Sequence, residues 1–358
     1  MFILRIENLQ TPALIVDLDR LEENQQILND LIACSPAKLR PHYKTNKTTQ
    51  IAYMQLAAGA KGITCSKLSE ARDLVECGVE DVLIANQIVD PAKLAQVAAL
   101  AGCCHLTIAV DDLQNIKMLE RAAAAQDVTI HCLVEYEIGM GRCGVGSQEA
   151  LLELAKAITA CAHLEFAGIQ AYAGNISHEP STKVRSEEAK KIEDRLKSAK
   201  AYLEAHGIAV KEVSGCSTAS VADHAFADTV YTEFQCGSYV FMDAAYRPVA
   251  GLPFKNSLFV ATTIMSKGNG KIITDAGMKS VSLDQTLPVF VGYEDVAVEM
   301  SEEHCALPVS DDTVKVGQRM LLIPGHCCTT VNLYDYIYFV RDGRVVNKVP
   351  VTSRGGSQ

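Results

Sequence analysis

The nine residues Leu39-Arg40-Pro41-His42-Tyr43-Lys44-Thr45-Asn46-Lys47 join a short apolar run to an amphipathic helix pattern. Lys44 stands where the apolar run 39–44 ends, which is the predicted end of a strand. A partly desolvated position of this kind favours the neutral amine that Schiff-base chemistry needs. A solvated basic turn explains these nine residues equally well, so the rest of the chain has to decide between the two.

Outward from this stretch, short apolar runs alternate regularly with segments of helical period. We expect strands at 39–44, 61–65, 82–86, 106–110, 129–135, 165–171, 211–214 and 232–236, and helices at 48–58, 67–77, 91–101, 112–125, 147–160, 183–206 and 218–227. Strands this apolar indicate a parallel sheet buried on both faces. Eight of them close into a (β/α)8 TIM barrel, an α/β fold. The alternative is an open doubly wound sheet, which would also seat the apolar run 13–18.

The alternation of apolar runs with helical segments ends after Asp243. Between residues 256 and 350, β-branched runs are separated by turns such as Gly268-Asn269-Gly270, which is typical of antiparallel hairpins. We therefore predict two domains: a barrel over 19–246 and a mostly antiparallel β domain over 247–358, which residues 1–18 would join.

Composition excludes several classes of function. The 358 residues carry a net charge of −10, which argues against nucleic-acid binding and against adhesion to anionic membranes. No stretch approaches the roughly 18 apolar residues of a spanning helix, and the N-terminus lacks a signal-peptide pattern. The 13 cysteines include no C-x-x-C pair, and several lie in apolar runs, as buried thiols do in a reducing compartment. We therefore expect a cytoplasmic protein.

The active site of a (β/α)8 barrel lies at the carboxyl ends of its strands. There, Ser214-Gly215-Cys216-Ser217-Thr218 and Gly237-Ser238-Tyr239 follow the last two predicted strands. Free amides and hydroxyls at such turns suit a phosphate. Each turn alone is more often a simple capped turn, but two in adjacent units are more specific. A lysine together with a phosphate site favours pyridoxal phosphate.

The run Gly139-Met140-Gly141-Arg142-Cys143-Gly144 matches the dinucleotide pattern G-x-G-x-x-G. The next predicted strand ends in Tyr172, with no carboxylate where a ribose needs one. We interpret the loop as directing Arg142 into the barrel mouth. An ordinary turn with a solvated arginine remains the alternative.

His326-Cys327-Cys328 follows a Pro324-Gly325 turn. On an extended segment, His326 and Cys328 would share one face, and imidazole and thiolate suit a divalent transition metal, zinc above all. Taken alone, such a pair is more often part of a core. His178, taken alone, indicates only a solvated loop histidine.

Together the motifs resemble the fold-type III pyridoxal-phosphate enzymes, and within them the D-threonine aldolases and D-serine dehydratases. The resemblance spans about residues 10 to 350. It rests on Arg40-Pro41-His42-x-Lys44, Gly139-x-Gly141-Arg142-x-Gly144-Val145, Gln170-x-Tyr172-x-Gly174-x-x-x-His178, Gly237-Ser238-Tyr239-Val240-Phe241-Met242-Asp243, Asp275-Ala276-Gly277-Met278-Lys279 and Pro324-Gly325-His326-x-Cys328-x-Thr330-Val331-Asn332-Leu333.

The resemblance implies a role for each group of residues. Lys44 would hold pyridoxal 5'-phosphate covalently, and a divalent metal (zinc, manganese or magnesium) would lie beside the β-hydroxyl of a D-amino acid. The relatives pair head to tail, so a homodimer is expected. The implied ligands are Gly215, Thr218, Gly237 and Ser238 for the phosphate, Arg142 and Tyr172 for the ring, and His326 and Cys328 for the metal.

Two reactions fit this resemblance: retro-aldol cleavage of a D-threonine-like substrate to glycine and an aldehyde, or dehydration of D-serine or 3-hydroxy-D-aspartate to a keto acid and ammonia. His178 has the spacing of the aldolases and would be a base near the β-hydroxyl, so we favour the aldolase. Cys328 instead resembles the dehydratases, and Asn46 replaces a histidine of the family. A cofactor carrier without turnover, or a racemase using Tyr246 or Tyr334, are further alternatives.

Overall fold

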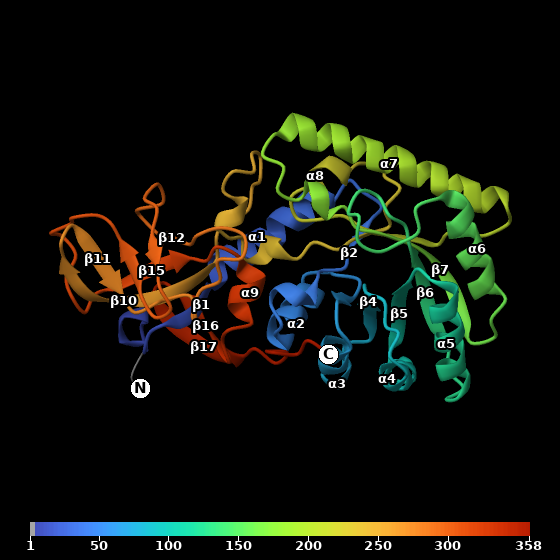
Figure 1. Cartoon of the computed structure of the whole chain (residues 1–358), viewed down its shortest axis with the longest axis horizontal. Helices are drawn as coiled ribbons and strands as arrows, with labels where there is room; N and C mark the ends of the chain where they lie inside the picture. Colours follow the sequence, from blue (N-terminus) through green and yellow to red (C-terminus); the bar gives the residue numbers. More distant parts are fainter. Residues whose placement is uncertain (1–3) are drawn as a thin grey trace.

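The computed structural model describes residues 4–358, which form a parallel and a mostly antiparallel sheet at opposite ends of an elongated molecule (Figure 1). The parallel sheet has eight strands in the order β2-β9-β8-β7-β6-β5-β4-β3. They are β2 (Lys38–Leu39), β3 (Ile63–Cys65), β4 (Asp81–Ile84), β5 (His105–Val110), β6 (Ile130–Glu135), β7 (Leu164–Ala171), β8 (Glu212–Gly215) and β9 (Glu233–Phe234).

This sheet curls back on itself as a TIM barrel does. Backbone bonds from Lys61 N to Leu39 O (2.8 Å) and from Thr64 N to Pro41 O (2.9 Å) join its two ends. The predicted α/β fold is therefore confirmed, and the open doubly wound alternative is excluded. The helices between the strands are α2 (Thr49–Ala57), α3 (Leu68–Glu76), α4 (Pro91–Ala101), α5 (Leu113–Ala124), α6 (Gln148–Thr159), α7 (Thr182–Ala205) and α8 (Val221–His224), and α1 (Leu18–Ile32) precedes the barrel.

Two of the predicted elements are much shorter than expected. The strand expected at 39–44 ends at Leu39, because Pro41 has no N–H to continue the ladder, and residues Tyr43–Thr45 form the 3-10 helix η2. The helix expected at 218–227 is the single turn α8. Ser217 and Ser220 precede it and bond to each other (Oγ···Oγ 3.0 Å), and serines that bond locally compete with a helix.

The second sheet contains β1 (Ala13–Asp17), β10 (Leu258–Gly268), β11 (Lys271–Thr274), β12 (Val289–Phe290), β13 (Glu299–Met300), β14 (Cys305–Leu307), β15 (Arg319–Ile323), β16 (Tyr336–Arg341) and β17 (Arg344–Pro350). Strand β1 runs antiparallel to β10 and parallel to β16, so the apolar run 13–18 contributes to this sheet and not to the barrel. The domain limits at 246/247 stay a prediction.

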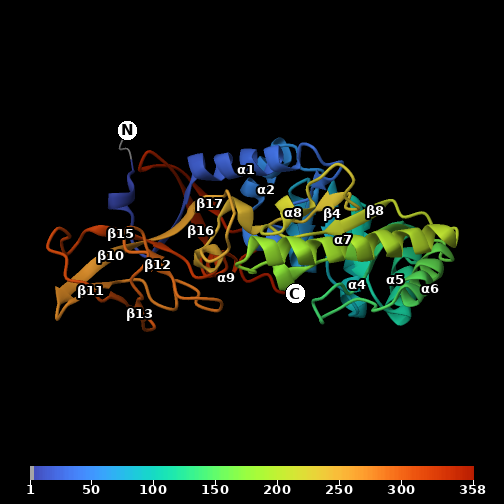
Figure 2. The same ribbon diagram turned by 90° about the horizontal axis from the view of Figure 1, so that it is seen from above.

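Three smaller features connect the two sheets. The short helix α9 (Cys327–Val331) packs against η2 of the barrel. The 3-10 helices η4 (Ser238–Val240) and η5 (Ala244–Tyr246) follow the last barrel strand. Figure 1 shows the chain end beside α3, where Ser69 N donates to Gln358 O at 3.0 Å, and Figure 2 shows the two sheets at opposite ends of the molecule from above. Within residues 4–358, no helix has the length and apolarity that crossing a bilayer requires.

Candidate active site

Lys44 lies in η2, at the carboxyl end of the first barrel strand. His42 precedes the turn in an extended conformation, and its Nδ1 accepts the Lys44 N–H at 3.5 Å. Lys44 Nζ lies 5.4 Å from the centroid of the Tyr172 ring, and the Arg142 guanidinium lies 5.7 Å from the same ring. Three of the expected residues, Lys44, Arg142 and Tyr172, therefore meet at one point of the rim.

These side chains line a cavity of about 260 Å³ at the mouth of the barrel. Burial, together with the charges of Lys44 and Arg142, lowers the pKa of His42 well below its usual value, so its ring is neutral at pH 7. Ser66 Oγ lies 3.4 Å from His42 Nε2. Ser66, Asn86, Gln170 and Gln235 also line the cavity.

The glycine-rich loop 139–144 does not offer its amides to a ligand. Gly139 N and Gly141 N donate to Glu137 Oε1 at 2.7 and 2.8 Å, and Gly144 N donates to Asp111 Oδ2 at 2.9 Å. A dinucleotide phosphate would need these same donors. The geometry instead agrees with the interpretation that the loop directs Arg142 over Tyr172.

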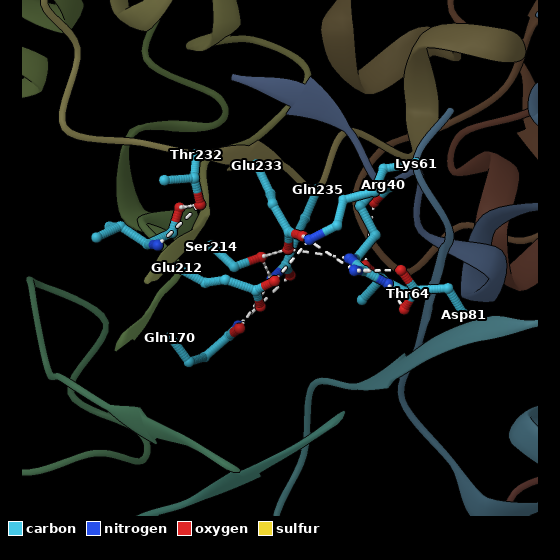
Figure 3. Close-up of polar contacts among 11 residues, drawn as sticks. Arg40, Lys61, Thr64, Asp81, Gln170, Glu212, Ser214, Thr232, Glu233 and Gln235 are labelled. Carbon is cyan, nitrogen blue, oxygen red and sulfur yellow. Dashed lines mark hydrogen bonds and ion pairs between the residues drawn. The ribbon is translucent and has the colours of Figure 1, made fainter. Parts of the chain in front are cut away.

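The floor of the cavity rests on a polar network inside the barrel (Figure 3). Gln235 Nε2 donates to Gln170 Oε1 at 2.7 Å and to Ser214 Oγ at 2.9 Å. Ser214 donates to Glu233 at 2.9 Å, and Glu233 receives two bonds of 2.9 Å from the fully buried Arg40. Because each buried charge has a partner, the network is a rigid support for the two amides that face the cavity.

The two glycine turns after β8 and β9 lie side by side. Thr218 Oγ1 accepts the Tyr239 N–H at 3.2 Å, which leaves the Thr218 hydroxyl proton free to donate. Within residues 4–358, no protein acceptor bonds the N–H groups of Gly237 and Ser238. A Cβ on Gly237 would collide with Thr45, and one on Gly215 with Ala171 O. Free donors on two adjacent turns fit a phosphate.

His326 and Cys328 reach the same region from the β domain. The prediction of an extended segment is wrong: His326 is the N-cap of α9, and Cys328 lies in its first turn. Cys328 Sγ lies 3.6 Å from Thr45 Oγ1, next to Lys44 in the η2 turn. Cys328, from the second sheet's side of the molecule, therefore lies against the turn that carries Lys44.

The chemistry of this pair fits a divalent metal. Burial alone would lower the pKa of His326, but Cys328 and Asp284 raise it to about 9. A hydrogen bond from Cys327 lowers the pKa of Cys328 well below its usual value, and nearby His326 lowers this pKa further, although burial opposes both. Residues 4–358 hold no cluster of three metal-ligating side chains. A pair with open positions is typical of a catalytic and not a structural site.

His178 follows β7 in the loop before α7, and its ring centroid lies 4.8 Å from that of Tyr246. Burial lowers its pKa, and the charge of nearby His326 lowers it further. His178 is therefore neutral at pH 7 and lies near His326 and Cys328. Tyr334, one of the two tyrosines considered as the base of a racemase, donates its hydroxyl proton to Ser280 O at 2.8 Å.

Sequence reasoning missed three residues that shape this site. Gln235 stands in an apolar strand and gives no signal of a ligand contact. Asp243 accepts the Cys327 N–H at 2.8 Å. It is the last residue of the motif 237–243, and that motif indicates no separate role for it. Asp284 binds the His326 ring from a loop 42 residues away, and nothing local to Asp284 indicates this.

Two family profiles cover most of the chain. "Alanine racemase, N-terminal domain" matches residues 16–245, and "Putative serine dehydratase domain" matches residues 257–340. The fold and these matches define a class of enzymes in which an alanine racemase-like barrel precedes a β domain.

Individual relatives narrow this class. A "3-hydroxy-D-aspartate aldolase" from Paracoccus denitrificans (strain Pd 1222) is 37% identical over 97% of this chain and 92% of its own. The crystal structure of D-threonine aldolase from Filomicrobium marinum has a TM-score of 0.96 at 35% identity, covering 100% of this chain and 99% of that one. The D-threo-3-hydroxyaspartate dehydratase of Delftia sp. (strain HT23) is 27% identical over 90% and 92%. This chain belongs to the D-threonine aldolase and 3-hydroxy-D-aspartate aldolase family of lyases.

Proposed function

We propose that the protein is a pyridoxal 5'-phosphate- and divalent metal-dependent lyase. It cleaves 3-hydroxy-D-amino acids of the D-threonine type to glycine and an aldehyde. The main support is one arrangement: Lys44 lies on the rim between a cavity with neutral His42 and the His326–Cys328 pair, in a chain 35% identical to a D-threonine aldolase over its full length.

In this proposal the barrel holds the cofactor. Lys44 would hold the cofactor through its amine, Tyr172 and Arg142 would contact its ring, and the glycine turns would bind its phosphate. When bound, pyridoxal phosphate supplies an electron sink for negative charge at the substrate α-carbon. The phosphate ligands are Gly215, Thr218, Gly237 and Ser238.

The β domain and His178 act on the other end of the substrate. His326 and Cys328 hold the divalent cation, whose Lewis acidity suits a β-hydroxyl oxygen. His178, neutral at pH 7, accepts the β-hydroxyl proton. Loss of that proton lets the Cα–Cβ bond break and the aldehyde leave, and a proton taken up at Cα completes glycine. We also propose a homodimer, which light scattering would test.

The dehydratase reaction is the second candidate, because Cys328 supplies a thiolate ligand and the Delftia dehydratase is a relative. Purified protein with cofactor and Mn²⁺ or Zn²⁺ should convert D-threonine to glycine and acetaldehyde. Ammonia and pyruvate from D-serine, with no glycine from D-threonine, would replace the aldolase proposal by the dehydratase.

A matched pair of lysine variants tests the cofactor assignment. Lys44→Ala should remove the visible absorption band of the lysine-bound cofactor, together with all turnover. Lys38→Arg is the control, because Lys38 is an exposed lysine at the amino end of β2, opposite the end that carries Lys44. A band that persists in Lys44→Ala would contradict the proposal.

A further inference from the structure

We propose that Asp284 is a positioning residue for the metal site, which fixes the tautomer and direction of the His326 ring. Asp284 Oδ2 lies 2.8 Å from His326 Nδ1. The inference rests on the proposed function, because it takes His326 as a metal ligand.

The carboxylate is itself held in place from two elements. Its other oxygen, Oδ1, accepts a hydrogen bond from Ser282 in its own loop. Thr329 Oγ1, in the first turn of α9, lies 2.8 Å from Oδ1 and 2.7 Å from Ser282 Oγ. Asp284 therefore has a fixed orientation although 46% of its side chain is exposed.

A neutral imidazole carries one proton, and the bond made by one nitrogen decides which nitrogen is free. With the Nδ1 proton donated to Asp284, the lone pair of His326 is on Nε2. Cys328 lies in the first turn of α9, two residues after His326, which is the N-cap. The imidazole and the thiolate can then converge on one cation, and a carboxylate behind a ligating histidine raises its basicity.

The backbone between the two ligands is anchored separately. Asp243 accepts the Cys327 N–H at 2.8 Å, and Ala244 N donates to Pro324 O at 2.9 Å. These bonds fix where α9 begins but leave rotation of the His326 side chain free. Asp284 makes the hydrogen bond that removes this freedom.

The test measures metal affinity on cofactor-loaded protein by titrating Zn²⁺ and Mn²⁺ against a chromogenic chelator. Asp284→Ala should raise the metal Kd by about 10- to 100-fold. Asp284→Asn should raise it less, because an amide oxygen still accepts the Nδ1 proton. Asp312→Asn is the matched control: it removes the same charge from an exposed position of the same domain and should leave the Kd unchanged.

Rescue by metal separates positioning from a structural role. At saturating metal, kcat of Asp284→Ala should return most of the way to the wild-type value, and the visible cofactor band should be unchanged throughout. The inference is overturned if the Kd of Asp284→Ala stays within twofold of wild type while His326→Ala loses the metal. It is equally overturned if Asp284→Ala loses all binding, which would make Asp284 a ligand. Wild-type affinity in His326→Ala would overturn both the inference and the metal site on which it rests.

Discussion

At the residue scale, the buried His224 forms an ion pair with Glu193 that should affect the stability of the fold. Its Nδ1 lies 3.1 Å from Glu193 Oε1, which also accepts from Thr229 Oγ1 at 2.6 Å. Both members of the pair are buried, and Cys216, in the turn after β8, is near enough for its charge to act on His224. Burial alone would lower the pKa of His224, but Glu193 and Cys216 raise it above 6.5. The pKa of Glu193 is lowered, because bonds from His224 and Thr229 outweigh its burial.

Stability should therefore depend on pH through this pair. The contribution of His224 is fully present below its unfolded pKa of 6.5 and is lost as pH rises through the higher folded value. That of Glu193 is present above 4.5 and is lost as pH falls through its lowered folded value. His224→Gln should cost about 3–5 kcal/mol near pH 6 and clearly less at pH 9. Urea unfolding at both pH values measures the difference.

The exposed His304 supplies the control. His304→Gln should change the free energy of unfolding by less than about 0.5 kcal/mol at either pH. A cost of His224→Gln that is the same at pH 6 and pH 9 would show that His224 is not protonated in the folded protein.

At the scale of elements, the segment after β17 fastens the turn that carries Lys44. The hydroxyls of Tyr43 and Thr352 lie 2.8 Å apart, and Ser353 N donates to Lys47 O at 3.0 Å. Lys47 adopts a φ of 46°, an unfavourable conformation for a side chain other than glycine, which persists only where its surroundings hold it. Lys47 Nζ also pairs with the buried Glu70 at 3.0 Å. The segment after β17 and helix α9 therefore both pack against η2 and hold it in place.

A double-mutant cycle tests this attachment. Tyr43→Phe and Thr352→Val each remove one hydroxyl with little change in shape, and each should cost about 1–2 kcal/mol of unfolding free energy. Together they should cost less than the sum, with an interaction energy of about 0.5–1 kcal/mol. Strict additivity in urea unfolding would mean that the two hydroxyls do not interact. Thr313→Val, at an exposed site remote from η2, is the control for loss of a threonine hydroxyl.

Sequence predicts elements and motifs well and long-range contacts poorly. Seven of the eight barrel strands fall where apolar runs predict them, because a strand buried on both faces must be apolar throughout, whereas β2 shares only Leu39 with the predicted run 39–44. Lys44, Arg142 and Tyr172 follow from the rule that strand ends meet at one rim. The contact of Asp284 with His326 does not, because it joins two loops of the β domain that are 42 residues apart in sequence. That of Thr352 with Tyr43 does not, because it depends on how the chain end packs against the barrel. The extended geometry expected for His326-Cys327-Cys328 holds only for His326, the N-cap of α9, because the helix already begins at Cys327 and no residue pattern marks that start.

At the scale of the whole molecule, the barrel lies in sequence between β1 and the other strands of the second sheet. One apolar core joins barrel residues such as Val82 to Leu14 of β1 and Val260 of β10. The two sheets therefore share buried surface, and neither can lose its packing without exposing that of the other. This continuity predicts a single cooperative unfolding transition.

The chain contains no tryptophan, so an introduced one reports on one site alone. Phe226→Trp would report on the barrel and Tyr293→Trp on the β domain, both at half-buried positions. In urea, the fluorescence of each variant should change at the same midpoint as its far-UV circular dichroism, and the two variants should unfold at similar midpoints. Fluorescence that changes well before the dichroism in either variant would mean that the domains unfold independently.

The pairing of β1 with β10 also sets an order of events during synthesis. Strand β1 leaves the ribosome early, but its antiparallel partner begins only at Leu258. At about 5–20 residues per second, an apolar strand with open edges waits on the order of 10–50 s for that partner. The nascent chain must therefore keep Ala13–Asp17 from aggregating while the whole barrel is made, so a chaperone that shields this strand would raise the yield of folded enzyme more than one that acts on the completed chain.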